Sequence, residues 1–485
     1  YGAIFNVCIK TWRINILLKK PNKMKTFSFT ALFIISGFVQ AQTALDAYIL
    51  NKMEDEHISG LGAALVKDGE LLWFGNYGLA NREENIPVTE STIYMLASVS
   101  KTITVTAVMQ LYEDGLFELD DAVNDYLPFD VYNPNYPDSV ITIKQLLTHT
   151  SAIRDNWDLL PYFDGDAPIP LGDFLFDYLS VDGVNYNAAL NFAEFAPNTT
   201  YEYCNVAVAL LGYLVEELSG QPFNEYCHEN IFEPLCMDNT GWFLREIDTS
   251  LVAHPYSYLG DEYVDNGLYG YPDYPDGQLR TTVLSLTKFM YAHMNYGNFD
   301  GYQLLDSATV ALMRSEIVPD ILDLQGLIFY AYEDAYGTWW GHNGGDAGVS
   351  TDMYFNDETN TGLILLTNSD ANHQDIWNEI LASMDTIVNT LAPEIACVIG
   401  QPTGVEDMAE TEIMLFPNPA DKYIFMQTPE DHAFETRIYN LQGQLVLSGK
   451  NESQVYIGSL QPGVYMLTCF YENEQKIVSA KFEKY

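Results

Sequence analysis

The stretch "SVSKTITVTAVMQLYEDG" (98–115) places a serine and a lysine three residues apart at the start of a segment that is apolar on nearly every side. Such a segment predicts a buried helix that ends at Gly115. Ser98 and Lys101 then lie on one side of the helix. A buried lysine is costly without a role, and we expect desolvation to lower its pKa, so that a neutral amine accepts the Ser98 proton. The helix N-terminus would supply N–H groups to a developing oxyanion.

The same spacing recurs in "SLTK" (285–288), for which a structural interpretation suffices. Four residues follow the helical i, i+3, i+4, i+7 pattern of a core-facing stripe: Leu286, Phe289, Met290 and His293. Ser285 stands where an N-cap belongs, Lys288 lies off the stripe toward solvent, and the helix ends near Gly297.

Two further motifs accompany the first Ser-x-x-Lys. Tyr203-Cys204-Asn205 stands at the start of an apolar helical segment (205–220), and His342-Asn343-Gly344 lies between predicted strands. A second Tyr-x-Asn, at 471–473, is interpreted as ordinary strand sequence. The three motifs in this order are far more specific than any one alone, and they match the needs of nucleophile, base and orienting group.

The chain from 43 to 393 alternates between helix-like and strand-like segments. Residues 60–81 predict a hairpin that turns at Asp68-Gly69, and strands are predicted over 350–357 and 361–369. Strands at both ends and helices between them predict one α+β unit with a helical insertion. A polar linker (394–412) and a small all-β module (413–485) follow.

The charge balance excludes some partners. The formal net charge is -45, so nucleic-acid binding is not expected. Basic residues concentrate before residue 42, where residues 24–41 have the charged start, apolar run and small-residue end of a signal peptide. Residues 1–23 are interpreted as an upstream extension. No other apolar stretch is long enough to predict a stable membrane span.

The cysteine spacing predicts no metal site, and we expect no cofactor. Cys227 and Cys236 are close enough in sequence to form a disulfide, which an exported protein permits. The Tyr-, Asp- and Gly-rich segment 261–278 has three possible roles: lining a substrate groove, binding Ca²⁺, or forming a solvated loop. Because it lacks a calcium-loop spacing, we expect the loop.

Residues 43–393 resemble the class C β-lactamase-like serine hydrolases, which include penicillin-binding DD-peptidases, D-aminopeptidases and esterases. Besides the three motifs, "LLTHTSAI" (146–153) and "NIFEPLCMDNTGW" (230–242) carry the resemblance, with Ala152 and Cys236 where glycine is usual. The resemblance implies a two-lobed fold, with an antiparallel sheet flanked by helices plus a helical lobe. The small all-β module is expected to be a sandwich.

The resemblance also implies roles for individual residues. Ser98 would be the acylated nucleophile, with Lys101 and Tyr203 sharing proton transfer and Tyr203 acting as phenolate or as relay. Asn205 would orient the substrate amide and the lysine. The oxyanion hole would use the N–H groups of Ser98 and Gly345, next to the His342-Asn343-Gly344 motif.

The third motif departs from true β-lactamases, which have Lys-Thr-Gly there. His342 is mostly neutral at neutral pH, so a substrate carboxylate would be held weakly and in a pH-dependent way. A D-amino-acid peptidase of the DD-carboxypeptidase type, or an esterase, is therefore favoured over antibiotic hydrolysis. The alternative is a catalytically silent, penicillin-binding-like surface protein.

The C-terminal module resembles the type A sorting domain of the type IX secretion system of Bacteroidetes. "FPNPADKYI" (416–424), "IYNLQGQLVLSG" (438–449) and "LQPGVYMLTCF" (460–470) carry this resemblance. It implies an interaction with the secretion machinery, and secretion or display at the outer-membrane surface.

Overall fold

The computed structural model describes residues 44–384 and, beyond them, the strands and short adjoining segments of a C-terminal module between 414 and 484. The chain divides into two compact units, residues 1–399 and 400–485. The predicted signal peptide, upstream extension and linker lie outside the described residues. Among the described helices, none is long and apolar enough to cross a bilayer.

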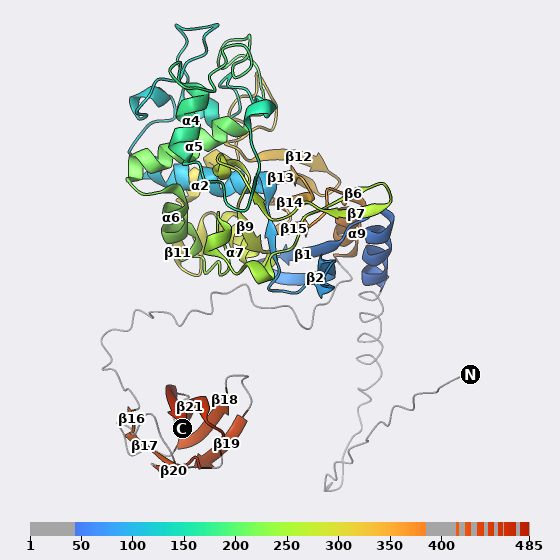
Figure 1. Ribbon diagram of the computed structural model, residues 1–485, viewed down its shortest axis with the longest axis vertical. Coiled ribbons are helices and arrows are strands. Elements are labelled where there is room, and N and C mark those ends of the chain that lie inside the picture. Colours follow the sequence, from blue (N-terminus) through green and yellow to red (C-terminus); the bar gives the residue numbers. More distant parts are fainter. Residues whose placement is uncertain are drawn as a thin grey trace, which may run out of the picture. The chain divides into compact units, whose positions relative to one another are not determined.

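The first unit contains a seven-stranded antiparallel sheet, in which strands from the two ends of the unit are neighbours (Figure 1). In spatial order the strands are β12 (Tyr330–Asp334), β13 (Gly337–Asp346), β14 (Val349–Asn356), β15 (Thr361–Thr367), β1 (Gly60–Lys67), β2 (Glu70–Asn81) and β3 (Ile86–Pro87). Asp68 and Gly69 connect β1 to β2 with φ of 52° and 84°, as a tight hairpin turn requires. The predicted hairpin and the two predicted C-terminal strands are confirmed.

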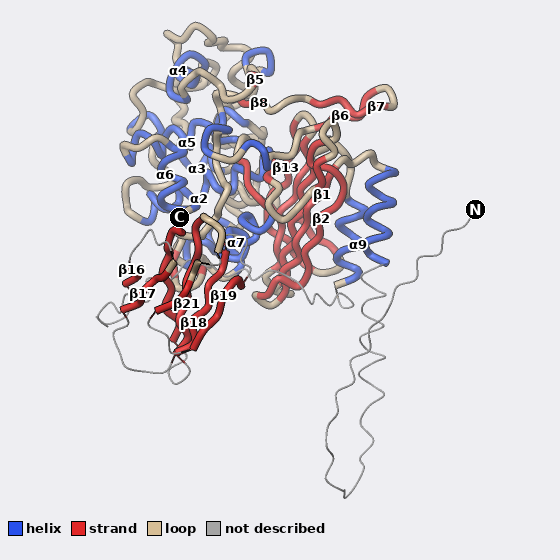
Figure 2. The backbone as a smooth tube through the Cα atoms, turned by 60° about the horizontal axis from the view of Figure 1, so that its bottom comes forward, coloured by secondary structure: helices blue, strands red, loops and turns tan. Residues whose placement is uncertain are grey.

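Helices cover both faces of this sheet (Figure 2). On one face α7 (Val283–Met294) packs against β1, β14 and β15. On the other, a helix over residues 44–55 and α9 (Gln374–Ser383) bury a second apolar cluster against the sheet. At the start of α9, His373 hydrogen-bonds Ser350 and Asp352 of β14, which ties this helix to the sheet.

The segment between β3 and β12 forms the predicted helical insertion. Its central helices are α2 (Ser100–Glu113) and α5 (Asn205–Ser219), which pack on each other in the main core. Against α5 pack α3 (Ile143–Leu147), α4 (Leu171–Leu179) and α6 (Phe223–Cys227), and α8 (Ser307–Met313) follows later in the same segment. α5 ends at Gly220, whose φ of 71° suits glycine.

Two positions where the resemblance predicts glycine have the backbone geometry that glycine favours. Ala152 has φ 61° and Cys236 has φ 53°, so the backbone of both residues lies in the left-handed region. Each such residue costs about 1–2 kcal/mol relative to ordinary backbone geometry. Cys236 is disulfide-bonded, whereas Cys227 is a buried free thiol, so the pairing considered for these two residues is wrong.

The second unit is all-β, as predicted. One sheet contains β16 (Met414–Phe416), β17 (Tyr423–Gln427) and β20 (Gln454–Tyr456). The other contains β19 (Leu445–Lys450), β18 (Phe434–Asn440), β21 (Gly463–Tyr471) and β22 (Lys476–Lys484) in that spatial order. The second Tyr-x-Asn begins at Tyr471, the last residue of β21, and its other two residues lie outside the described residues.

Candidate active site

Ser98 lies in a sharp turn between a strand and a helix. The short strand β4 (Ile93–Met95) leads into a 3-10 turn, η1 (Ala97–Val99), and α2 continues from Ser100. Ala97 has φ 46°, a strained geometry for alanine. Ala97 and Val99 are buried while Ser98 between them is partly exposed, so the turn presents the Ser98 hydroxyl at the surface of a cavity.

Lys101 is fully buried and directs its ammonium group at Ser98. Its Nζ donates to Ser98 Oγ at 3.0 Å, to Asn205 Oδ1 at 2.7 Å and to the Asp276 carbonyl oxygen at 2.6 Å. Burial acts to lower the pKa of Lys101, but Tyr203, Asp276 and Asp155 outweigh burial and raise that pKa above its ordinary value. The expectation of a neutral lysine is therefore wrong, because desolvation is not the only influence on this amine.

Tyr203 lies beside this pair, with its ring centroid 5.0 Å from Lys101 Nζ. Its hydroxyl is buried and lies close enough to the Lys101 ammonium group to raise the pKa of Lys101 through charge and a side-chain hydrogen bond. The ring of His149, from the "LLTHTSAI" segment, packs at 4.4 Å from the Tyr203 ring, and His149 Nδ1 accepts from the Cys204 N–H at 3.2 Å. The structure thus holds Tyr203 firmly while leaving its oxygen available for proton exchange.

Asp155 is a site residue that sequence reasoning missed. Its carboxylate accepts from the Asn205 N–H and Nδ2 at 2.9 Å each and from the Val206 N–H at 3.1 Å. It thereby caps α5 and orients the Asn205 amide, so that Oδ1 faces Lys101. An isolated aspartate 50 residues before its partner gives no signal in sequence.

Strand β13 brings the third motif to the other side of Ser98. A Cβ on Gly344 would lie 2.4 Å from the Leu96 oxygen, 2.4 Å from Thr351 Oγ1 and 3.0 Å from the Ser98 nitrogen. Gly344 therefore permits the close approach of β13 to the turn that carries Ser98. Gly345 is next along the strand and lines the same cavity as Ser98. β12 pairs with β13 only as far as Gly341, so β12 does not cover this part of the strand.

Gly344 and Gly345 provide a matched test of this packing. Gly344→Ala is expected to lower the free energy of unfolding by about 1–3 kcal/mol through overpacking, and to reduce the rate of Ser98 labelling. Gly345→Ala adds a Cβ that meets no atom within 4 Å, so its stability should remain within about 0.5 kcal/mol of the wild type. Urea unfolding of both variants measures the difference. Equal stabilities would contradict the role given to Gly344.

His342 is buried and neutral. Burial and the Lys101 charge lower the pKa of His342 to about 3, although the Asn343 carbonyl opposes this by contacting Nδ1 at 2.5 Å. Nε2 is buried without a partner among the described residues. Because the ring stays uncharged from pH 5 to 8, the expected pH-dependent hold on a carboxylate is wrong: no histidine charge appears in that range.

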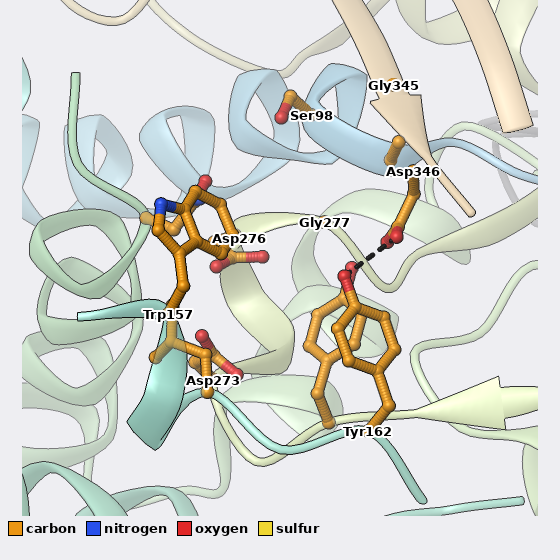
Figure 3. Close-up of a pocket in the computed structure, with 12 residues that line it drawn as sticks. Ser98, Trp157, Tyr162, Asp273, Asp276, Gly277, Gly345 and Asp346 are labelled. Carbon is orange, nitrogen blue, oxygen red and sulfur yellow. Dashed lines mark hydrogen bonds between the residues drawn. The ribbon is translucent and has the colours of Figure 1, made fainter. Parts of the chain in front are cut away.

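The cavity around Ser98 has two parts. The smaller, about 60 Å³, is lined by the 157–162 segment, the 271–277 segment, Asn205 and Asp346 (Figure 3). The larger, about 470 Å³, is lined by Tyr201, Tyr203, His342 and the 322–331 region. Both parts include Ser98 and Gly345. A substrate bound across Ser98 would therefore place one half in each part.

The structure revises the interpretation of segment 261–278. Residues 261–268 are exposed or partly exposed, but residues 269–278 are buried, and Tyr271, Asp273, Asp276 and Gly277 line the smaller part of the cavity. This half of the segment is not the solvated loop that was expected. The composition of the segment is polar and therefore indicated a solvated loop. Its burial depends on packing beside α2, which composition does not reveal.

The second Ser-x-x-Lys lies elsewhere and is structural, as predicted. Thr282, not Ser285, caps α7 by accepting from the Ser285 N–H at 3.1 Å. Ser285 Oγ donates to the Asp238 carbonyl oxygen at 2.9 Å. Lys288 is half-buried rather than directed at solvent, and its Nζ donates to the Cys236 carbonyl oxygen at 2.5 Å.

Both units of the chain are similar to known proteins. A family model described as Beta-lactamase matches residues 45–380, and one described as Secretion system C-terminal sorting domain matches residues 414–482. Penicillin-binding protein 4 of Amycolatopsis lactamdurans is 26% identical over 373 residues, which cover 73% of this chain and 92% of that protein. The penicillin-binding protein structure from Bacillus halodurans is 26% identical with a TM-score of 0.57, covering 69% of this chain and 98% of that one. The D-amino acid amidase structure from Ochrobactrum anthropi SV3 has a TM-score of 0.58 at 20% identity, covering 71% of this chain and 98% of that one, and shows the fold alone.

Proposed function

Because the chain belongs to the Beta-lactamase family and has a C-terminal sorting domain for secretion or cell-surface display, we propose that it is an exported serine hydrolase that forms an acyl-enzyme on Ser98. Its substrates are D-amino-acid peptides, as for a peptidase of the DD-carboxypeptidase type, or esters, rather than β-lactams. The observation that carries the proposal is the hydrogen-bonded set Ser98, Lys101 and Asn205 with the Tyr203 hydroxyl beside it.

The chemistry follows from these positions. Ser98 Oγ bonds to the substrate carbonyl carbon, and its proton passes to Tyr203, which acts as a phenolate or as a relay next to the Lys101 ammonium. The carbonyl oxygen becomes an oxyanion between the N–H groups of Ser98 and Gly345. The proton then moves to the leaving nitrogen or oxygen as its bond to carbon breaks. Water repeats these steps on the acyl-enzyme and restores Ser98.

Three observations count against β-lactams, which carry a carboxylate. His342 is neutral where a lysine would offer a permanent cation to the carboxylate of a β-lactam. None of the described residues that line either part of the cavity is a lysine or arginine. The chain's net charge of -45 further repels anionic antibiotics at long range.

Covalent labelling tests the proposal against the silent-binder alternative. The folded protein is treated with a fluorophosphonate and, separately, with a fluorescent penicillin, and adducts are located by intact mass and peptide mapping. We expect one fluorophosphonate adduct, on Ser98. Penicillin labelling would favour a DD-peptidase over a plain esterase. No adduct from either probe would support the silent binder and overturn the proposal.

The C-terminal module gives the proposal its location. We infer that residues 413–485 are recognised by the type IX secretion machinery. The substrate is then met outside the cell or at its surface.

A further inference from the structure

The smaller part of the cavity is acidic and aromatic. Three carboxyl groups line it, from Asp273, Asp276 and Asp346, together with the rings of Trp157, Tyr162 and Tyr271 (Figure 3). Trp157 is 67% exposed although it is large and apolar, and it stands at the edge of this hollow. Carboxylates and aromatic faces are the groups that bind organic cations in proteins.

Two of these carboxyl groups are buried without a direct ion pair, although the Lys101 charge acts on both. Asp273 is 4% and Asp276 is 5% exposed, and no basic side chain forms an ion pair with either among the described residues. Asp273 instead hydrogen-bonds Asp276. Burial acts first to raise the pKa of both groups, and their proximity to Asp155 adds to this. Such a pair is unfavourable when ionised, and a cation placed between the groups would stabilise it.

The nearby cations are already engaged with backbone carbonyl groups. Lys101 Nζ contacts the backbone oxygen of Asp276, not its carboxyl group. Arg280 donates to the carbonyl oxygens of Tyr269, Gln278 and Trp242. Asp346 accepts from Tyr162 Oη at 2.8 Å and from a backbone N–H. Among the described residues, no cation therefore contacts the Asp273 and Asp276 carboxyl groups directly, and a ligand could supply one.

The position of Tyr203 indicates which half of the substrate would occupy the smaller, acidic part of the cavity. The group that protonates the leaving atom must face it, and Tyr203 lines the larger part of the cavity but not the smaller. The leaving group therefore occupies the larger part, and the acyl half occupies the acidic part. At about 60 Å³ this part suits a compact group.

We propose that this acidic hollow binds a free ammonium group on the acyl half of the substrate, which makes the enzyme selective for amides or esters of amino acids with an unblocked amine. The inference rests on the proposed function and specifies its substrate class. It assigns Asp273 and Asp276 to substrate binding. The group that the enzyme recognises on its substrate would then be a free amine rather than a terminal carboxylate.

A pair of substrates with one leaving group tests this inference: D-alanine p-nitroanilide and its N-acetylated form. We expect the kcat/KM ratio of free to acetylated substrate to be about tenfold or more. Asp276→Asn, which keeps the shape of the side chain, should lower the ratio toward one. Asp323→Asn removes an exposed carboxyl from the larger part of the cavity and should leave the ratio unchanged.

The pH dependence of the same ratio gives a second readout. Burial, together with Asp155, raises the pKa of Asp273 to about 7, while Asp276 and Lys101 oppose this. Asp346 is the further carboxyl group that acts on Asp276. The ratio should therefore rise through pH 7 as the pair ionises and fall near pH 8 as the substrate amine loses its proton. In Asp276→Asn the rise should weaken.

The outcomes separate this inference from the proposed function. Fluorophosphonate labelling of Ser98 is measured on the same samples, and a thermal melt establishes that each variant is folded. Turnover of both substrates at equal rates, or faster turnover of the acetylated one, overturns the ammonium site and leaves the hydrolase standing. Labelling without turnover of the free-amine substrate also overturns the ammonium site. Neither labelling nor turnover overturns the proposed function itself.

Discussion

Replacing Ser98 with alanine is expected to lower kcat/KM for any substrate of this protein by at least ~10³-fold while the fold survives. In the proposed mechanism the bond to the acyl group forms at Ser98 Oγ, which accepts a hydrogen bond from Lys101 Nζ at 3.0 Å. Lys101 keeps its contacts to Asn205 and Asp276 in the variant, so its charge stays compensated. Hydrolysis of a p-nitrophenyl ester, with fluorophosphonate labelling alongside, measures the loss.

Ser285→Ala is the matched control, because it alters the serine of the second Ser-x-x-Lys. That hydroxyl donates to the Asp238 carbonyl oxygen, so its loss should cost about 0.5–1.5 kcal/mol of stability and leave kcat/KM unchanged. Full activity in Ser98→Ala, or an adduct that persists at another residue, would show that the nucleophile has been wrongly assigned.

Much of the fold was predictable because its signals are local. Asp68-Gly69 requires a turn wherever it occurs between two apolar runs, and Gly220 ends α5 through its own backbone geometry. The three motifs were likewise predictable as a set, since each occupies a fixed place at the start of a helix or within a strand. The structure brings Ser98, Lys101, Tyr203, Asn205, His342, Gly344 and Gly345 together around one cavity.

What could not be predicted depends on long-range contacts. Asp155 acts on Asn205 from 50 residues away, and Asp276 approaches Lys101 across 175 residues. The charge state of Lys101 was wrongly predicted for this reason: burial is visible in the apolar pattern of its helix, but the oxygens that outweigh burial come from other segments. The small shift from Ser285 to Thr282 as the cap of α7 is a local error, since both residues can cap a helix.

The acidic hollow shows the same limit. Segment 261–278 contains the right residues for cation binding, yet nothing in its composition places Asp273 and Asp276 beside a nucleophile. The net charge of the chain also gives no indication that Asp273 and Asp276 are buried. A chain with charge -45 is expected to spread its carboxylates over solvent, whereas these two are buried at the site.

Replacing Lys101 with methionine is the second large effect, and its consequences differ from those of Ser98→Ala. Methionine fills similar space but removes three hydrogen-bond donors and a charge from a fully buried position. We expect kcat to fall by about 10²–10⁴-fold, because Tyr203 loses the ammonium that assists proton transfer. Stability at pH 7 should fall by about 1–3 kcal/mol, since Asn205 Oδ1 and the Asp276 carbonyl oxygen become unpaired.

The pH dependence of stability distinguishes this loss from a simple packing defect. The folded-state pKa of Lys101 is raised, so its contribution is fully present below the unfolded-state pKa of about 10.4 and is lost as pH rises through the folded-state value. The stability gap between wild type and Lys101→Met should therefore be constant from pH 7 to 9 and narrow at higher pH. Lys288→Met, which removes one contact to the Cys236 carbonyl oxygen, should keep full activity. A gap that widens from pH 7 up to about pH 10.4 and is constant above it would mean that Lys101 is buried as the neutral amine, and the nucleophile's base would then be Lys101 itself.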